Sequence, residues 1–215
     1  MRRDLVTGFI SIVVFAILLG LGYPLLVTGV SQAVFPGKAN GSLIKKNGVV
    51  VGSALIGQQF YEDVVGKNGK VKMVKGVAVT QPDPRYFQTR PSATVPSDNA
   101  AGSSFSNLGP NSKATLAAIS ANIQTYLGLE KPYDPGLTAA RIPVDAVNSS
   151  ASGIDPDISV ANAQIQAHRI AAVRHSSLSA VDALIAKYTT ARSLGFLGEP
   201  GVNVLELNLA IDRSR

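Results

Sequence analysis

Residues 9–30, FISIVVFAILLGLGYPLLVTGV, decide how this chain is organised. Fourteen of these 22 residues are Leu, Ile, Val or Phe, and no residue from 5 to 37 is charged. A membrane-spanning helix needs about 20 predominantly apolar residues. Each such side chain gains roughly 0.3–0.6 kcal/mol at the bilayer centre, so insertion is favoured by about 4–8 kcal/mol before the glycines and proline are discounted. The sequence therefore predicts one N-terminal transmembrane helix.

A cleaved signal peptide is the alternative interpretation of this segment. Arg2 and Arg3 form a basic start, and Ser31-Gln32-Ala33 resembles a cleavage site. The apolar region of a secretory signal is only about 7–15 residues long, so we expect an uncleaved anchor instead.

The orientation of the anchor rests on the positive charges at its two ends. Arg2 and Arg3 on one side are nearly balanced by Lys38, Lys45 and Lys46 on the other. Large domains cross a membrane largely regardless of their own charge, so the short N-terminus is the part expected to stay in the cytoplasm. The prediction is a single-pass protein whose domain lies outside.

The remaining chain has the composition of one soluble domain. Residues 1–35 are assigned to the cytoplasmic N-terminus and the membrane helix, and residues 36–215 to the domain. The absence of cysteine excludes disulfides, thiolate catalysis and cysteine-based metal sites. The net charge is +6, but the lysines gather between Lys38 and Lys75 without a basic helix or a series of aromatic residues. We therefore expect lipid headgroups or an acidic partner, not nucleic acid.

Turn chemistry predicts two β-hairpins and one long loop. Residues 42–46 and 49–53 flank Asn47-Gly48, the dipeptide preferred in type I′ turns. Asn68-Gly69 repeats the signal in a lysine-rich stretch. Residues 81–110 contain five prolines and are expected to form a loop. The apolar side of the second hairpin would consist of Val71, Met73 and Val77.

Helical spacing of apolar residues predicts three helices, at 112–127, 160–175 and 178–190, with Gly128 as the stop signal of the first. Residues 202–211 alternate apolar and polar side chains in their second half, which predicts a half-buried final strand. This mixed order indicates an α+β fold: a single N-terminal transmembrane helix followed by one mixed soluble domain. The expected N-caps are Asn111 or Ser112, Ser159, and Ser177 or Ser179.

A membrane-anchored serine acyl-enzyme of the penicillin-binding class is the alternative function. Ser42-Leu-Ile-Lys45 fits S-x-x-K, and Ser97-Asp98-Asn99 fits S-D-N. The nucleophile of that class opens a helix, whereas Ser42 is expected in a hairpin arm, and the K-T-G element is missing. The match therefore fails on its context.

The other candidate groups favour no catalytic or metal site. His168 and His175 lie seven residues apart but lack a third ligand at usable spacing, so we assign no metal. Asp145, Asp155 and Asp157 fit ordinary turn chemistry before a serine-capped helix. The sequence also has no phosphate-binding G-x-x-x-x-G-K-[ST] loop and no G-x-S-x-G elbow. No residue is assigned a catalytic role.

Seven segments in order along almost the whole chain are typical of one family. They resemble the C subunit of the bacterial Kdp-type potassium-transporting ATPase. The segments are 35–44 (FPGKANGSLI), 52–58 (GSALIGQ), 86–93 (YFQTRPSA), 106–110 (SNLGP), 147–156 (VNSSASGIDP), 166–174 (QAHRIAAVR) and 202–212 (VNVLELNLAID).

The resemblance implies an accessory, non-catalytic subunit of an ATP-driven potassium uptake pump in the bacterial cytoplasmic (inner) membrane. Its partners would be a channel-like potassium-binding subunit, a P-type ATPase subunit and a very small F subunit. The phosphorylation motif D-K-T-G of P-type ATPases is absent here. ATP would therefore be met only through the complex, and no cofactor is assigned to this chain.

Two roles follow from the resemblance, and they conflict over topology. In the first, the subunit is a catalytic chaperone that raises the ATP affinity of the ATPase subunit through a glutamine corresponding to Gln166, which requires a cytoplasmic domain. In the second, the domain lies outside, over the potassium entrance of the channel-like subunit, where it would stabilise the complex or influence ion access. The expected orientation of the anchor favours this second role. On an amphipathic helix, Gln166 is otherwise interpreted as a solvated or capping side chain. Arg90, Asn107 and Asn203 are expected to hold loops or to meet the partner subunit.

Overall fold

The computed structural model describes residues 2–94, 102, 108–109 and 111–214. Asn107 and the Ser97-Asp98-Asn99 motif lie outside the described residues. The chain divides into two compact units, Met1–Ser53 and Ala54–Arg215, and each is described by itself.

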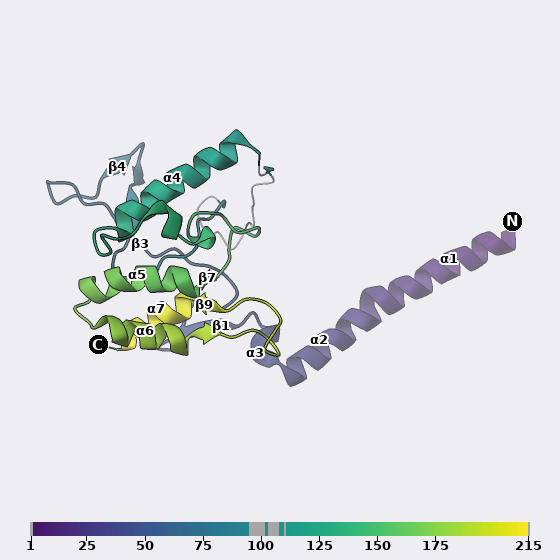
Figure 1. Ribbon diagram of the computed structural model, residues 1–215. Helices are drawn as coiled ribbons and strands as arrows, with labels where there is room; N and C mark the ends of the chain where they lie inside the picture. Colours follow the sequence, from purple (N-terminus) through teal and green to yellow (C-terminus); the bar gives the residue numbers. More distant parts are fainter. Residues whose placement is uncertain (1, 95–101, 103–107, 110, 215) are drawn as a thin grey trace. The chain divides into compact units, whose positions relative to one another are not determined.

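The first unit begins with a continuous helix made of α1 (Arg2–Ile17), the π-helical turn η1 (Leu18–Gly22) and α2 (Tyr23–Val34), drawn in purple in Figure 1. It is long and apolar enough to span a bilayer, and none of its side chains is buried. The π-turn ends two residues before Pro24, whose ring has no N–H for the hydrogen-bond ladder. The N–H of Tyr23 donates to the carbonyl of Leu18. This helix fits a single-pass membrane anchor.

The predicted hairpin of the first unit is confirmed. After the short helix α3 (Pro36–Ala39), β1 (Leu43–Lys46) pairs antiparallel with β2 (Val49–Ser53). Asn47 and Gly48 have φ values of 53° and 81°, the left-handed conformation that a type I′ turn requires at both positions. Ser42 has a φ of 49° and precedes a strand, so it does not open a helix as an acyl-enzyme nucleophile would.

The second predicted hairpin is present but branched. β3 (Tyr61–Asp63) pairs with β6 (Thr80–Pro82), and β4 (Met73–Val74) pairs with β5 (Val77–Ala78). The turn at Asn68-Gly69 is closed by a single bridge between Val65 and Val71. A second tight turn occurs at Lys75-Gly76, where Lys75 has a φ of 50°. It was not predicted because lysine is not a residue type that favours turns.

The helices and a small sheet form the rest of the second unit. α4 (Lys113–Glu130), α5 (Val160–Val173), α6 (Leu178–Lys187) and α7 (Val204–Arg213) accompany a three-stranded antiparallel sheet of order β7-β9-β8 (Asp157–Ser159, Gly201–Asn203 and Thr189–Thr190). Two 3₁₀ turns, η2 (Ala139–Arg141) and η3 (Val144–Ala146), follow α4. The hydroxyls of Ser159 and Ser177 cap α5 and α6 by accepting from the N–H groups of Asn162 and Ala180. The α+β prediction is confirmed.

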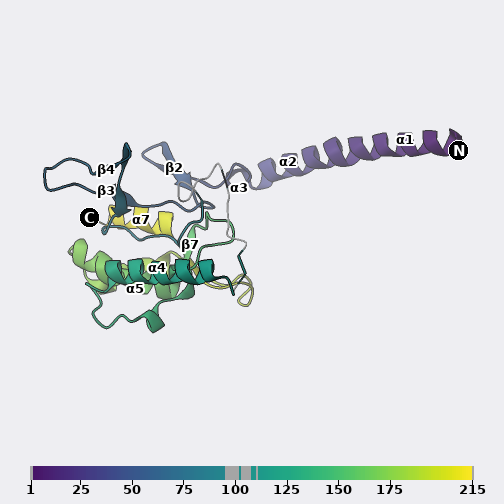
Figure 2. The ribbon, with the colours of Figure 1, turned by 90° about the horizontal axis from the view of Figure 1, so that it is seen from above.

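The core of this unit lies where α5 packs against α4 and α6, and α6 against α7. Figure 2 shows α4 lying along α5. Its largest apolar members come from the loop after β6, from the sheet and from three helices. A smaller cluster lies beneath α4. The main core includes Phe87, Ile158, Ile170, Ile185, Val202, Leu207 and Ile211.

Two helix ends and the type of the last element were predicted wrongly from the sequence. α4 continues past Gly128 to Glu130, because the buried contact of Glu130 with Arg169 outweighs the roughly 1 kcal/mol that a helical glycine costs. α6 ends at Lys187 because Thr189 and Thr190 join the sheet. The final strand predicted at 202–211 is a short strand followed by a helix.

The error at the last element has a physical cause. Leu205, Leu207, Leu209 and Ile211 alternate along the sequence as the inward residues of a strand would, but all four are buried on the helix α7. The signal for a helix was local: the side chain of Asn203 accepts from the N–H of Glu206 and caps the first turn.

Candidate functional site

The candidate site is built around the loop that follows β6. Phe87 and Gln88 in this loop receive their backbone hydrogen bonds from side-chain amides instead of a neighbouring strand. The N–H of Phe87 donates to Oδ1 of Asn208 (2.9 Å), and Nδ2 of Asn208 donates to the carbonyl of Phe87 (2.9 Å). Gln166 binds Gln88 in the same reciprocal way, at 2.7 and 3.1 Å. Two amides on α7 and α5 therefore hold the backbone of two consecutive residues in place.

Gln166 uses its whole hydrogen-bonding capacity inside the domain. Besides its bonds to Gln88, Oε1 accepts from Nη2 of Arg169 (3.0 Å), and Nε2 donates to Oδ1 of Asn162 (3.0 Å). An amide side chain offers two acceptor lone pairs and two donors, and all four are occupied. Gln166 is only 1% exposed, so its interpretation as a solvated or capping side chain is wrong.

Arg169 and Glu130 lie behind Gln166 as a buried ion pair. Nε of Arg169 lies 3.0 and 3.1 Å from the two carboxylate oxygens of Glu130, and both side chains are 1% exposed or less. Nη1 of Arg169 donates to the carbonyls of Pro84 (2.6 Å) and Tyr86 (3.0 Å). Burial raises the pKa of Glu130 to about 7, against the opposing pull of Arg169. The guanidinium therefore joins α4, α5 and the start of the loop.

The network continues through Asn162 to the N-terminus of α5. The hydroxyl of Tyr126 donates to Oδ1 of Asn162 (2.8 Å), and burial raises the pKa of Tyr126 well above its ordinary range. Asp145 accepts from Nδ2 of Asn162 (3.0 Å) and from the backbone and hydroxyl of Ser159 (2.8 Å each). Asp145 thus anchors the first turn of α5 from 14 residues away, which is not the local turn role predicted for it.

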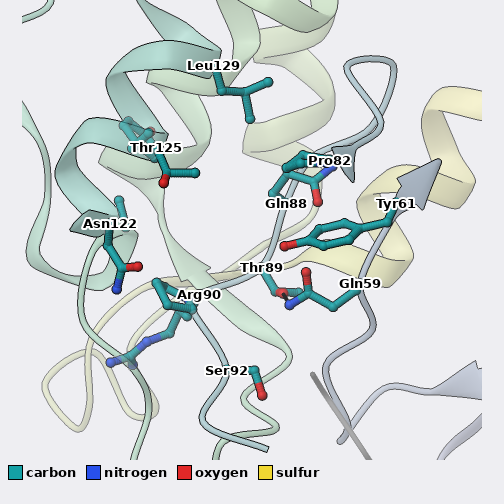
Figure 3. Close-up of a pocket in the computed structure, with 13 residues that line it drawn as sticks. Gln59, Tyr61, Pro82, Gln88, Thr89, Arg90, Ser92, Asn122, Thr125 and Leu129 are labelled. Atoms are coloured by element: carbon teal, nitrogen blue, oxygen red, sulfur yellow. Dashed lines mark hydrogen bonds between the residues drawn. The ribbon is translucent and has the colours of Figure 1, made fainter. Parts of the chain in front are cut away.

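An open pocket of about 230 Å³ lies on the other side of the loop. Figure 3 shows Asn122, Thr125 and Leu129 of α4 along one wall, with Gln88 and Tyr61 facing them. Oε1 of Gln88 is buried and has no hydrogen-bond partner within the described part of the chain. The pocket thus offers amide, hydroxyl and aromatic groups.

Arg90 lines this pocket and binds Asp155. Its Nη1 lies 2.9 Å from Oδ2 of Asp155, while its buried Nε has no partner among the residues described. Oδ1 of Asp155 accepts from the N–H of Asp157 in a turn. Arg90 therefore joins the end of the loop to the turn before β7.

Asn203 also holds chain segments together. Its Oδ1 caps α7, and its Nδ2 donates to the carbonyl of Ala54 (2.9 Å). The structure places Gln166 and Arg90 at the same loop, whereas Asn203 lies at the start of α7. His168 and His175 are exposed, and the described residues contain no group of three His, Cys, Asp or Glu side chains that would hold a metal.

Most of the network was missed from the sequence, although one signal was available. Asn162, Gln166 and Arg169 follow one another at spacings of four and three residues, which places three polar side chains on one face of a helix. The sequence did not indicate that these three polar side chains are buried. For Gln88 and Asn208, no nearby residue pattern indicated a role in the network.

Comparison with known proteins places the chain in one family. The family model "K+-transporting ATPase, c chain" matches residues 5–213. A protein of Methylococcus capsulatus is 47% identical over 209 residues, covering 97% of this chain and 96% of that protein. Relatives from Mycobacterium tuberculosis H37Rv (44% identical, covering 99% and 100%) and Bradyrhizobium diazoefficiens (41%, covering 100% and 98%) carry the same name, potassium-transporting ATPase KdpC subunit.

The chain combines one apolar helix that fits a single-pass membrane anchor with a mixed helix and sheet domain. This chain belongs to the KdpC family of potassium-transporting ATPase subunits. The family resemblance expected from the seven sequence segments is confirmed.

Proposed function

We propose that this chain is an accessory, non-catalytic subunit that the potassium pump needs for assembly and stability. The proposed partners are a channel-like potassium-binding subunit, a P-type ATPase subunit and a small F subunit. The observation that carries the proposal is the position of Gln166. This side chain is enclosed, and its four hydrogen bonds hold the domain together.

The alternative role, a catalytic chaperone that contacts ATP through Gln166, makes a different demand on this residue. Gln166 would have to leave Gln88, Asn162 and Arg169 to reach a nucleotide. Each intramolecular hydrogen bond contributes about 0.5–1.5 kcal/mol. In the proposed function, Gln166 instead positions the loop at residues 86–90, and ATP is bound by the ATPase subunit.

Gln166→Ala in the assembled pump tests this role, with Asn208→Ala as the matched control. Both amides hold one loop peptide reciprocally, at Gln88 and Phe87 respectively. We expect both variants to lower the thermal stability and the yield of assembled pump, with no change in the KM for ATP of the pump that assembles. A rise in the KM for ATP with Gln166→Ala but not with Asn208→Ala would favour the chaperone role.

Assembly itself is tested by deletion of this chain. With an affinity tag on the ATPase subunit, we expect the channel-like subunit to co-purify only when this chain is present. Equal recovery of the other subunits without it would contradict the assembly role.

We further propose that the N-terminus lies in the cytoplasm and the domain outside a bacterial inner membrane. The support is the short basic N-terminus before the apolar helix. Because the chain has no cysteine, Ala183→Cys on α6 provides a single labelling site. A membrane-impermeant maleimide should label it in right-side-out vesicles. Labelling only in inside-out vesicles would place the domain in the cytoplasm.

A further inference from the structure

Residues 64–79, which we call the lysine arm, connect β3 to β6. The arm contains Lys67, Lys70, Lys72 and Lys75, and no Asp or Glu occurs from Val64 to Pro82. All residues from 67 to 77 are exposed. The lysine arm thus carries four positive charges that no acidic residue of its own compensates.

The base of the arm is fixed by three backbone hydrogen bonds. The N–H of Val64 donates to the carbonyl of Val79 (2.8 Å), that of Val79 to Lys72 (2.8 Å) and that of Lys72 to Val64 (2.7 Å). Beyond this junction the arm divides at the turns Asn68-Gly69 and Lys75-Gly76. In Figures 1 and 2 the β4 segment extends away from helices α4 to α7. The four lysines of the arm lie within the exposed residues 67–77 and are therefore accessible from outside the domain.

Apolar side chains are interleaved with these lysines. Val65, Met73, Val74 and Val77 are 53–69% exposed. A hairpin that only contacts water gains nothing from this exposure, and a cluster of exposed apolar groups marks an interaction site. The lysine arm therefore offers a surface that is cationic and apolar at once.

We propose that the lysine arm binds the headgroup region of a bilayer that contains anionic lipids. Each lysine near such a surface contributes about 1 kcal/mol, and exposed apolar side chains add to binding by entering the boundary between headgroups and acyl chains. The chain's own helix keeps the domain tethered to a bilayer, so even a weak contact is populated. A second copy of the arm is excluded as the partner because the two would repel each other. The proposal depends neither on the assembly role nor on which side of the membrane the domain occupies.

The test uses the full chain in lipid nanodiscs, where both faces of the bilayer are accessible. Val77→Cys is labelled with an environment-sensitive fluorophore, and Ala183→Cys on α6 is the control position. In phosphatidylcholine with about one quarter phosphatidylglycerol, we expect blue-shifted emission at position 77 and quenching by brominated lipid, with neither effect at position 183. Raising the salt from 0.1 to 1 M, which shortens the Debye length from about 10 to about 3 Å, should reverse the shift.

Two double variants that remove the same charge distinguish an effect of the lysine arm from an effect of the net charge of the chain. Lys67→Gln/Lys70→Gln should abolish the shift at position 77, whereas Lys113→Gln/Lys131→Gln removes the same charge from α4 and its C-cap and should leave it intact. The proposal is overturned if position 77 stays in water in anionic nanodiscs, or if the shift is equal in pure phosphatidylcholine. It is also overturned if the shift occurs only with the other pump subunits present, which would identify an acidic protein surface as the partner.

Discussion

Replacing Arg169 by Met should destabilise the domain more than the loss of any exposed charge. The guanidinium is fully buried and donates to Glu130, Pro84, Tyr86 and Gln166. Methionine preserves the apolar stem but leaves the carboxyl group of Glu130 and the carbonyl of Pro84 without this partner. Removing one member of a buried ion pair costs about 3–5 kcal/mol. We expect a loss of this size in the free energy of unfolding at pH 8.5.

The cost should depend on pH because Glu130 titrates within the folded domain. Burial raises its pKa from 4.5 to about 7, so the folded state keeps a proton that the unfolded state releases. At pH 5.5 the carboxyl group is neutral in the parent and in Arg169→Met, and the variant loses only hydrogen bonds. At pH 8.5 it is ionised in the parent, and the variant also loses the attraction of the cation. The cost should therefore grow as the pH rises.

The assay is guanidinium unfolding of the detergent-solubilised chain, followed by near-ultraviolet circular dichroism of its six tyrosines. Arg192→Met is the matched control, because Arg192 and Glu199 form an exposed pair at 2.6 Å, for which we expect a cost below about 1 kcal/mol. The double variant Arg169→Met/Glu130→Met should recover most of the stability. An Arg169→Met chain within about 1 kcal/mol of the parent at pH 8.5, or a cost that shrinks with rising pH, would refute this account of the network.

Three further predictions concern single side chains. The raised pKa of Glu130 predicts that the free energy of unfolding of the parent falls between pH 4.5 and about 7, and Glu130→Gln should make this fall smaller. An equal dependence of the unfolding free energy on pH in the parent and the variant would contradict the prediction. His175→Gly should raise the free energy of unfolding by about 0.5–1 kcal/mol, because His175 follows the C-cap of α5 in a left-handed conformation, with a φ of 56°. A lower free energy of unfolding in the variant would count against this. Asn203→Ala should lower the free energy of unfolding by about 1 kcal/mol or more, whereas Asn203→Ser, which equally lacks the Nδ2 donor to Ala54, keeps a capping oxygen for α7 and should lower it less; equal melting temperatures for the two would exclude the capping role.

Much of the fold was predicted from residues that favour turns or cap helices. Asn47-Gly48 predicted the hairpin because only a few residue types adopt its left-handed turn, and Ser159 and Ser177 marked two helix starts. Residues 202–211 were different. Leu205, Leu207, Leu209 and Ile211 alternate with other residues and are all buried, a pattern that a half-buried strand of this length also shows.

The candidate site was less accessible to prediction because its partners are distant in the chain. Gln166 and Gln88 are 78 residues apart, and Asn208 and Phe87 are 121 residues apart. The family resemblance drew attention to Gln166, but nothing local indicated that its partner would be a backbone peptide. Only the folded arrangement brings these groups together.

Because Gln166 is enclosed, the orientation of the membrane anchor alone does not determine whether this chain can contact ATP. A cytoplasmic domain is necessary for direct contact between this chain and ATP, but it is not sufficient. Releasing Gln166 costs four hydrogen bonds, about 4 kcal/mol in all, and leaves the N–H and carbonyl of Gln88 without these partners. At 1.4 kcal/mol for each factor of ten, this conformational cost alone weakens a nucleotide contact roughly a thousandfold. Even inside the cell, the domain would therefore have to open around the loop at residues 86–90 before Gln166 met ATP, so the mechanism depends on this loop as well as on topology.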